Sequence, residues 1–347
     1  VVGRVVSVTG AWAHCVGWPL CIPSDPLGYW KLAHLVLVGV ASVFMVLVWR
    51  KAWREQRDQK LILPLVTVTG VLFVGQALVG AVEVTRAYPM HLVVLHGLTA
   101  IALWISLGFL AYASGTLAKD NPEVIKFDHR QRVKDFFVLS KPLIVALLLV
   151  TTYGGLVAGS KAWPSASLTF WTLFGGALAA AGSSALNQYI DRELDKKMQR
   201  TAKRPLADGR VTSAEGLSYG LALCLLSYYV MAGFVNLLAA LLSLAGIFYY
   251  VFFYSVWLKK ATVQNIVIGG GAGAIPPMVG WAAATGELGL AAWILFAIVF
   301  MWTPPHFWAL AIVRMKDYEK AGVPMLPVVE FFFKYRYKIE IYTIELI

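Results

Sequence analysis

Charged side chains are scarce in this chain of 347 residues. Asp, Glu, Lys and Arg make up 14% of it, hydrophobic residues reach 59% and the mean hydropathy is +0.68. Soluble domains carry about 25% charged residues. The shortage excludes an ordinary soluble domain and predicts an all-α polytopic membrane protein, with the lipid bilayer as its surroundings.

Acidic residues are fewer than basic ones, 19 against 30, which gives a formal net charge of +11. No RNA- or DNA-binding motif accompanies this excess, so it predicts no nucleic-acid partner. Short basic loops that fix the orientation of membrane helices explain it instead. The sequence also has no initial methionine and no recognisable signal peptide, and it ends in what resembles the start of a helix. We expect both ends to continue in a longer protein.

Apolar runs of about 20 residues, the length of a membrane-spanning helix, recur along the chain. They predict nine spans, at residues 28–49, 61–84, 90–114, 142–159, 168–188, 214–235, 237–257, 263–284 and 288–313. The longest polar connection separates the third span from the fourth. It predicts a membrane domain at 1–115, a cytoplasmic linker at 116–135 and a second membrane domain at 136–347.

The basic loops all fall on one side of the membrane if every predicted span crosses it. That side is cytoplasmic, and we expect the membrane to be a bacterial plasma membrane. The segment 11–26 then lies outside, where Cys15 and Cys21 are expected to form a disulfide in preference to free thiols. Cys224 falls within a predicted span and is expected to be buried and inert.

The densest cluster of charge lies in residues 187–205. Asn187, Asp191 and Asp195 recur every fourth residue, so on a helix they share one face. Carboxylates spaced in this way can bind Mg²⁺ together with the phosphates of a substrate. The surrounding basic residues, among them Arg200 and Arg204, could hold the rest of a diphosphate. A solvated basic loop is the alternative, and the spacing alone favours neither.

Two histidines, His34 and His96, fall in the outer parts of the first and third predicted spans. Ionisable residues inside a membrane are costly and usually functional, and paired imidazoles from neighbouring helices commonly ligate haem iron. For either histidine alone, a hydrogen-bonded interior side chain is the more common outcome. Together with the cysteine-containing loop, the pair favours a haem site.

Residues 1–115 resemble the second half of the heme A synthase family in four stretches: GAWAHC, GWPLC, LAHL and VVLHGLTA. The resemblance implies a four-helix bundle half in which His34 and His96 are the axial ligands of a b-type haem, with His91 a weaker candidate. The catalytic half of that family has a glutamate three residues before its first histidine, whereas this chain has Lys31. The likeness is therefore to the cofactor-binding half, and Lys31 is expected to extend toward the interface.

Several motifs follow one another from about residue 136 onward. Asn187, Asp191 and Asp195 match the motif NxxxDxxxD. Four longer stretches are LSKP at 139–142, LKKATVQNIVIGGGAGAIPPMVGW at 258–281, MWTPPHFWALAI at 301–312 and DYEKAGVPMLPV at 317–328. By the NxxxDxxxD motif this part of the chain resembles the UbiA-type intramembrane prenyltransferases, and by the longer stretches it resembles the heme O synthase group within them. The likeness weakens over residues 330–338.

This second resemblance implies a UbiA-type helical bundle that transfers the farnesyl group of farnesyl diphosphate to a vinyl group of haem b. It implies that Asn187, Asp191, Asp195 and Asp317 are catalytic and bind Mg²⁺. It further implies substrate contacts from Arg200, Arg204, Lys259, Lys260, Asn265 and His306. For the two lysines a positive-inside role is an equal alternative. His306 could instead satisfy carbonyls freed by the irregular backbone expected at Pro304 and Pro305.

The glycine-rich run 269–273 and the prolines at 276–277 are expected to permit close helix packing. Taken together, the two resemblances predict a fusion of consecutive enzymes of haem A formation, with Mg²⁺ and haem b as cofactors and cytochrome oxidase assembly proteins as candidate partners. One rival is a quinone or chlorophyll prenyltransferase. Another is a non-catalytic haem-binding membrane subunit.

Overall fold

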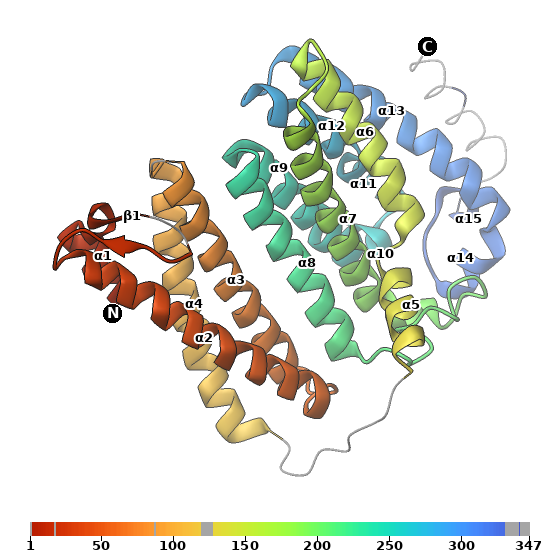
Figure 1. Cartoon of the computed structure of the whole chain (residues 1–347). Helices are drawn as coiled ribbons and strands as arrows, with labels where there is room; N and C mark the ends of the chain where they lie inside the picture. Colours follow the sequence, from red (N-terminus) through yellow and green to blue (C-terminus); the bar gives the residue numbers. More distant parts are fainter. Residues whose placement is uncertain (1, 17–18, 87, 119–127, 330–339, 341–347) are drawn as a thin grey trace. The chain divides into compact units, whose positions relative to one another are not determined.

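A computed structural model describes residues 2–16, 19–86, 88–118, 128–329 and 340 of the chain (Figure 1). The chain divides into two compact units, Val1–Ile125 and Lys126–Ile347. Apart from one two-stranded ribbon, the regular elements of the described part are helices. The predicted segment 330–338 lies outside the described residues.

The N-terminal unit is built on three long helices: α2 (Gly28–Glu55), α3 (Ile62–Thr85) and α4 (Met90–Leu117). The helix α3 packs against both of the others. Before them come α1 (Val2–Thr9), η1 (Ala11–His14), β1 (Cys15–Val16) and β2 (Ile22–Pro23). The two strands pair antiparallel, and a disulfide joins Cys15 to Cys21 across a Cα–Cα distance of 5.4 Å. The ribbon and the disulfide together close a small loop at the start of α2.

Lys31 departs from the expectation that it extends toward the interface. Its side chain is buried, with only 6% of the residue exposed. The ammonium group donates hydrogen bonds to the carbonyl oxygens of Trp12, at 3.2 Å, and Cys15, at 2.7 Å. A buried cation needs such acceptors, and the two loop carbonyls supply them. Lys31 therefore holds the disulfide loop on the first turn of α2.

The C-terminal unit is a bundle of longer helices with short ones at one end. Its long helices are α6 (Pro142–Ser160), α7 (Ala166–Asp195), α8 (Ser213–Phe234), α9 (Leu237–Phe248), α12 (Gly271–Thr285) and α13 (Leu290–Val313). The π-helix η2 (Tyr249–Leu258) continues α9, and the remaining helices are α5 (His129–Leu139), α10 (Lys259–Ala261), α11 (Asn265–Gly269), α14 (Met315–Ala321) and α15 (Leu326–Val329). Because α4 continues to Leu117 and α5 begins at His129, part of the predicted linker is helical.

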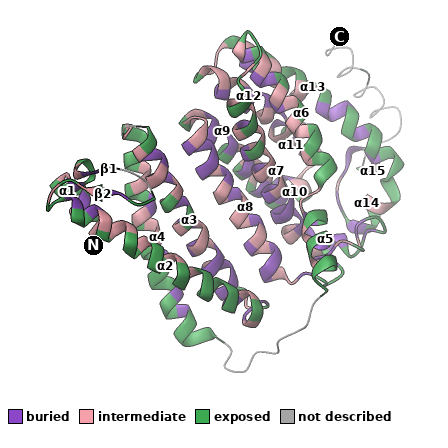
Figure 2. Cartoon of the chain, in the orientation of Figure 1, coloured by how far each residue is buried: buried purple, intermediate pink, exposed green. Residues whose placement is uncertain are grey.

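Among the described residues, eight helical segments are long and apolar enough to cross a membrane, which confirms an all-α polytopic membrane protein. The remaining predicted span, 168–188, falls within α7, which does not meet that criterion. Glycine and serine lower its hydropathy, and its buried residues include Gly175, Gly182, Ser183 and Ser184. The helix α7 runs through the interior of its unit and packs most extensively against α8 (Figures 1 and 2).

Close contact between α6 and α12 depends on glycine at two crossing points. A Cβ atom added to Gly155 would lie 2.0 Å from the carbonyl oxygen of Pro277, and one added to Gly280 would lie 1.9 Å from that of Thr152. In the run where close packing was expected, Gly269 abuts the ring of Tyr254, but Gly273 has nothing within 4 Å. One of the two tightest approaches therefore involves Pro277, which belongs to the predicted stretch, and the other, at Gly280, lies just beyond it.

Replacing Gly280 with alanine should destabilise the C-terminal unit by about 1–3 kcal/mol, because the added methyl group meets backbone that cannot move away. The expected readout is a lower midpoint of thermal unfolding in detergent. The substitution Gly273→Ala in the same helix is the matched control, since its methyl group meets open space. It should leave the midpoint unchanged or raise it slightly. Equal losses from both substitutions would contradict the packing described here.

Candidate functional site

The last turns of α7 carry a row of buried polar side chains. Asn187, Asp191 and Asp195 are 4%, 1% and 3% exposed. The amide Nδ2 of Asn187 donates to Oδ2 of Asp191 at 2.8 Å and to Oγ of Ser255 at 3.0 Å. Two carboxylates and an amide thus lie on one face of α7 at its C-terminal end, as their spacing of four residues requires.

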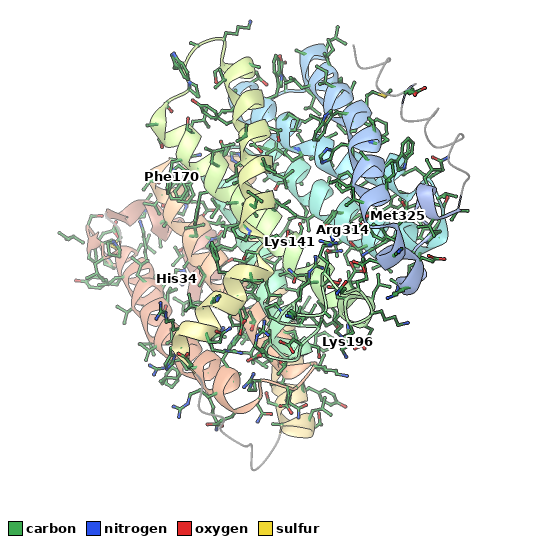
Figure 3. All side chains as sticks on the ribbon, turned by 90° about the vertical axis from the view of Figure 1, so that its right-hand side faces the viewer. His34, Lys141, Phe170, Lys196, Arg314 and Met325 are labelled. Atoms are coloured by element: carbon green, nitrogen blue, oxygen red, sulfur yellow. A yellow bond between two sulfur atoms is a disulfide. The ribbon has the colours of Figure 1, made fainter. Side chains whose placement is uncertain are left out.

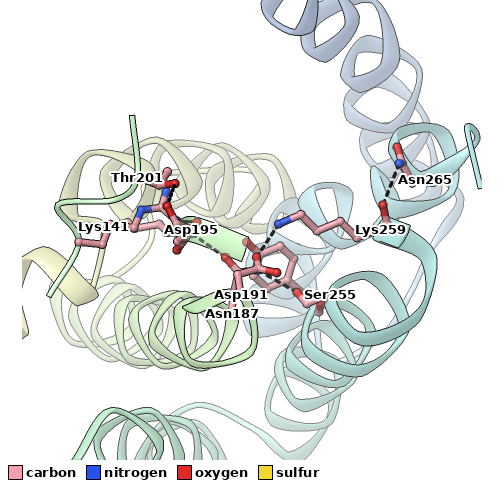
Figure 4. Close-up of polar contacts among 10 residues, drawn as sticks. Lys141, Asn187, Asp191, Asp195, Thr201, Ser255, Lys259 and Asn265 are labelled. Atoms are coloured by element: carbon pink, nitrogen blue, oxygen red, sulfur yellow. Dashed lines mark hydrogen bonds and ion pairs between the residues drawn. The ribbon is translucent and has the colours of Figure 1, made fainter. Parts of the chain in front are cut away.

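Three cations contact this row, each from a different segment (Figure 4). Lys141 donates to Oδ1 of Asn187 at 2.9 Å, and Lys259 lies 2.5 Å from Oδ2 of Asp191. Arg204 spans both carboxylate oxygens of Asp195, at 3.0 and 2.8 Å. Because these groups are largely removed from water, their mutual attraction is screened far less than that of a surface pair.

Lys141 reaches the row because of a local backbone feature. It is the residue before α6 and adopts a left-handed conformation with φ 49°, a geometry that costs energy for a side chain other than glycine. The following Pro142 starts the helix, where its missing N–H is tolerated. Lys141 therefore lies at the junction of α5 and α6, outside both helices, and its side chain is directed inward (Figure 3).

The π-helix η2 delivers the other side of the site. Ser255, fully buried, donates its hydroxyl to the carbonyl of Tyr250 and accepts from Asn187. Lys259 directly follows the π-helix as the first residue of α10. π-Helical turns are rare and are often found at functional sites, because the wider turn changes which side chains face a neighbour. Here the change brings Ser255 and Lys259 to the face of α7.

The electrostatic balance of the row fits the binding of a cation and an anion together. Oδ1 of Asp191 is buried and has no hydrogen-bond partner, although a carboxylate oxygen normally accepts one. Burial, with the neighbouring cations Arg204 and Lys259, lowers the pKa of Lys141 to about 7. One oxygen thus lacks a positive partner, while the clustered cations repel each other and would be stabilised by a polyanion.

Asp317, the remaining predicted ligand, lies on the short helix α14 and is partly exposed. The next residue, Tyr318, packs against a hydrophobic cluster that includes Leu194 of α7 and Trp308 of α13. This packing holds the α14 segment at the end of α7 where the acidic row lies. Within the described part of the chain, no three His, Cys, Asp or Glu side chains converge in a metal-binding arrangement. The structure therefore does not gather the predicted ligands into a closed set.

The other predicted substrate residues divide into buried and exposed ones. Asn265 is fully buried and donates to the carbonyls of Lys259, at 3.3 Å, and Pro324, at 3.4 Å, while its Oδ1 lacks a partner. It ties α11 to the segment after α14. By contrast, the side chains of Arg200 and Lys260 are exposed.

His306 departs from the expectation of an irregular backbone around it. The helix α13 continues through Pro304 and Pro305 to Val313. The imidazole is exposed on this helix and stacks on Trp302, with ring centroids 4.3 Å apart, and meets the edge of Phe307. The buried residues of the same stretch are Thr303, Pro304, Pro305 and Trp308. His306 is thus on the outer face of its helix, and its contacts are with aromatic neighbours.

In the N-terminal unit, each of the two predicted haem ligands faces a glycine. A Cβ atom on Gly3 of α1 would lie 3.0 Å from Cε1 of His34, and one on Gly80 of α3 would lie 3.0 Å from Cε1 of His96. Both histidines are partly buried, whereas His91 is exposed. Glycine at both contacts leaves room for an imidazole that must keep a fixed orientation.

Two residues of these sites were not among the predicted ones. Lys141 was part of the LSKP stretch, but only the fold shows that it reaches Asn187. Glu83 lies 3.8 Å from Nδ1 of His96 and is the only acidic residue of the helix α3. A lone carboxylate in an apolar span could have signalled it, since such residues are usually functional.

Comparison with known proteins identifies the class. The family model described as the UbiA prenyltransferase family matches residues 148–343. Two solved structures share the fold. One is digeranylgeranylglyceryl phosphate synthase, with a TM-score of 0.53 and 18% identity over 62% of this chain and 75% of that one. The other is a UbiA homologue from Archaeoglobus fulgidus bound to DMAPP and Mg²⁺, with a TM-score of 0.50 and 21% identity over 61% of this chain and 76% of that one. The chain belongs to the UbiA prenyltransferase family.

Relatives of known name narrow this class. The chain is 39% identical to the protoheme IX farnesyltransferase of Roseiflexus sp. (strain RS-1), an alignment that covers 100% of this chain and 69% of that protein. It is 53% identical to the protoheme IX farnesyltransferase of Gloeobacter violaceus over 57% of this chain and 65% of that protein. These matches confirm the predicted enzyme class, that of the protoheme IX farnesyltransferases. The Roseiflexus alignment includes the N-terminal unit, and the comparisons give no support to the predicted fusion with a heme A synthase half.

Proposed function

We propose that the C-terminal unit transfers the farnesyl group of farnesyl diphosphate to a vinyl group of haem b, giving haem O. The observation that carries this proposal is the buried row of Asn187, Asp191 and Asp195 with a cation on each member. Buried charged residues in a membrane protein are energetically costly and usually functional, so a row of this kind indicates a site for a charged substrate. The names of the relatives supply the identity of the two substrates.

Asp191, Asp195 and Asn187 would hold Mg²⁺, with Asp317 a further ligand from α14. The unpartnered Oδ1 of Asp191 supports this assignment, because it is a buried anionic oxygen in need of a cation. When bound, Mg²⁺ supplies neutralisation of the negative charge that develops on the leaving diphosphate. The oxygen-only donor set suits this metal.

Lys141, Lys259 and Arg204 would bind the diphosphate. Each contacts an oxygen of the row through a charge-assisted interaction, which a phosphate oxygen can replace without leaving the cation unpaired. In the reaction, the allylic C–O bond breaks and its electron pair leaves with the diphosphate. A vinyl π bond of the haem then attacks the allylic carbon, which leaves a cation on the vinyl carbon beside the macrocycle. One water adds to that carbon and loses a proton to solvent, which completes the hydroxyethylfarnesyl group. Until that attack, the buried helix faces around the row keep bulk water away from the allylic cation.

The orientation follows from the charge of the loops. We assign the end of α7 with the acidic row to the cytoplasmic side, where the soluble head of farnesyl diphosphate reaches it. The loop closed by Cys15 and Cys21 then lies outside, in an oxidising compartment. A quinone acceptor is the rival within the fold, and the name of the relatives, protoheme IX farnesyltransferase, favours haem.

The substitution Asp191→Asn should abolish product formation, because the neutral amide cannot compensate a divalent cation. The measurement is mass analysis of the haem after the purified chain is incubated with haem b, farnesyl diphosphate and Mg²⁺. Asp208→Asn is the matched control, since Asp208 is an exposed acid in the loop after α7 that pairs with Arg210. It should retain activity. Farnesylated haem formed by the Asp191 variant at the normal rate would refute the assigned role.

Lys141→Met should lower kcat/KM for farnesyl diphosphate about 10- to 100-fold, the effect of losing one charge-assisted hydrogen bond of roughly 1.5–3 kcal/mol. The control is Lys161→Met. Lys161 ends the same helix, has a similar backbone conformation with φ 54° and is exposed. Initial rates over a range of farnesyl diphosphate concentrations distinguish the two. If both variants kept normal values, Lys141 would have no place in the diphosphate site.

For the N-terminal unit, the proposed function is haem b binding by His34 and His96, as in the cofactor-binding half of a heme A synthase. The partly buried rings and the glycines that face them support it. Lys31 occupies the position of the catalytic glutamate in the other half, and it is fully used in holding Trp12 and Cys15. The unit is thus proposed to hold a haem rather than to oxidise one.

His34→Ala and His96→Ala should each remove the low-spin spectrum of a haem with two imidazole ligands, since one axial ligand is lost. The full chain reconstituted with haem b is examined by optical and electron paramagnetic resonance spectroscopy. His91→Ala, which alters an exposed histidine of the same helix α4, should keep the low-spin signal. A low-spin signal that is retained in both His34→Ala and His96→Ala would show that the haem is bound elsewhere.

A further inference from the structure

Glu83 and the partly buried His96 are neighbours, and each has a buried polar atom that lacks a hydrogen bond. Glu83 is 8% exposed, and its Oε2 lies 3.8 Å from Nδ1 of His96. Its other oxygen, Oε1, is buried with no hydrogen-bond partner, and so is Nδ1 of His96. An unsatisfied polar atom in an apolar interior costs about 1–3 kcal/mol, more for a charged group. Two such atoms on neighbouring helices indicate an arrangement kept for a function.

The orientation of the His96 ring is set by α3. Gly80 and Glu83 are three residues apart and therefore share one face of this helix. A Cβ atom at Gly80 would lie 3.0 Å from Cε1 and 3.4 Å from Nδ1, and Nε2 is not within 4 Å of that position. The Nδ1 edge of the ring thus lies against α3, and Nε2 is directed away from it. Nε2 is the nitrogen available to a ligand.

We propose that Glu83 is the positioning residue of a haem ligand: it accepts a hydrogen bond from Nδ1–H of His96, while Nε2 of that ring binds the haem iron. This inference rests on the proposed haem site of the N-terminal unit. A histidine that binds a metal almost always donates its other N–H to a carboxylate, a carbonyl or water, which fixes the tautomer and orients the ring. Among these partners the described structure offers Glu83, at 3.8 Å.

A carboxylate partner also has a measurable electronic effect. It draws the Nδ1 proton and makes the imidazole a stronger donor to the iron. A stronger donor stabilises ferric over ferrous iron, so the midpoint potential of the haem is lower than with a neutral partner. The potential is therefore expected to depend on the charge of Glu83, transmitted through His96.

The test is a potentiometric titration of the low-spin haem in the full chain. Glu83→Gln retains the size of the side chain and removes its charge. It should keep the haem content and shift the midpoint potential to a more positive value. Glu83→Asp keeps the charge and should bring the potential back toward that of the unchanged protein. Glu55→Gln is the control, because Glu55 is a carboxylate at the end of α2 paired at the surface with Lys51, and its loss should leave the potential unchanged.

An unchanged potential in Glu83→Gln, with normal haem content, would overturn the inference while leaving the haem site intact. Absence of low-spin haem from the unchanged protein would instead overturn the haem site itself. If the glutamine variant fails to fold, the unchanged protein still decides the matter through infrared difference spectra of haem reduction. A carboxylate band that shifts on reduction and that moves to a different frequency in Glu83→Asp is expected, which distinguishes Glu83 from the haem propionates. A set of carboxylate bands identical in the unchanged protein and in Glu83→Asp would also overturn the inference.

Discussion

Buried charge is the constraint on which the C-terminal unit depends. Removing a carboxylate from water costs several kcal/mol unless a cation and further hydrogen bonds compensate it. Asp191 and Asp195 meet that requirement through Lys259 and Arg204, and Asn187 joins the row through Lys141. The start of α6, the end of the π-helix and the loop after α7 are therefore all brought to one end of one helix. The same network that allows the unit to fold is the one that can receive a metal and a diphosphate.

The regular parts of this arrangement are visible in the sequence. Apolar runs locate the helices, and the fourfold spacing of Asn187, Asp191 and Asp195 places them on one face, because both depend only on local periodicity. The span expected at 168–188 forms a helix, but its small residues serve packing inside the bundle. Hydropathy alone does not distinguish a lipid-facing helix from one surrounded by other helices.

Other parts depend on tertiary contacts that no local pattern records. The left-handed backbone at Lys141 and the π-helix that presents Ser255 are stabilised by the neighbours of these residues. Lys31 also depends on a tertiary contact. A lysine near the end of a span suggests a side chain at the membrane interface, but this one is buried and donates hydrogen bonds to carbonyls of the disulfide loop. The irregular backbone expected around His306 is likewise absent, since the pair Pro304 and Pro305 remains within the regular helix α13.

The row on α7 is proposed to bind a divalent cation and the diphosphate together. Mn²⁺ can replace Mg²⁺ as a paramagnetic probe, and farnesyl thiodiphosphate can replace the substrate without reacting. Electron–nuclear double resonance of that complex should show ³¹P coupling to Mn²⁺ in the unchanged protein and none in the variant with both Asp191→Asn and Asp195→Asn. Undiminished coupling in the double variant, or no coupling in the unchanged protein, would contradict joint binding of the cation and the diphosphate by this row.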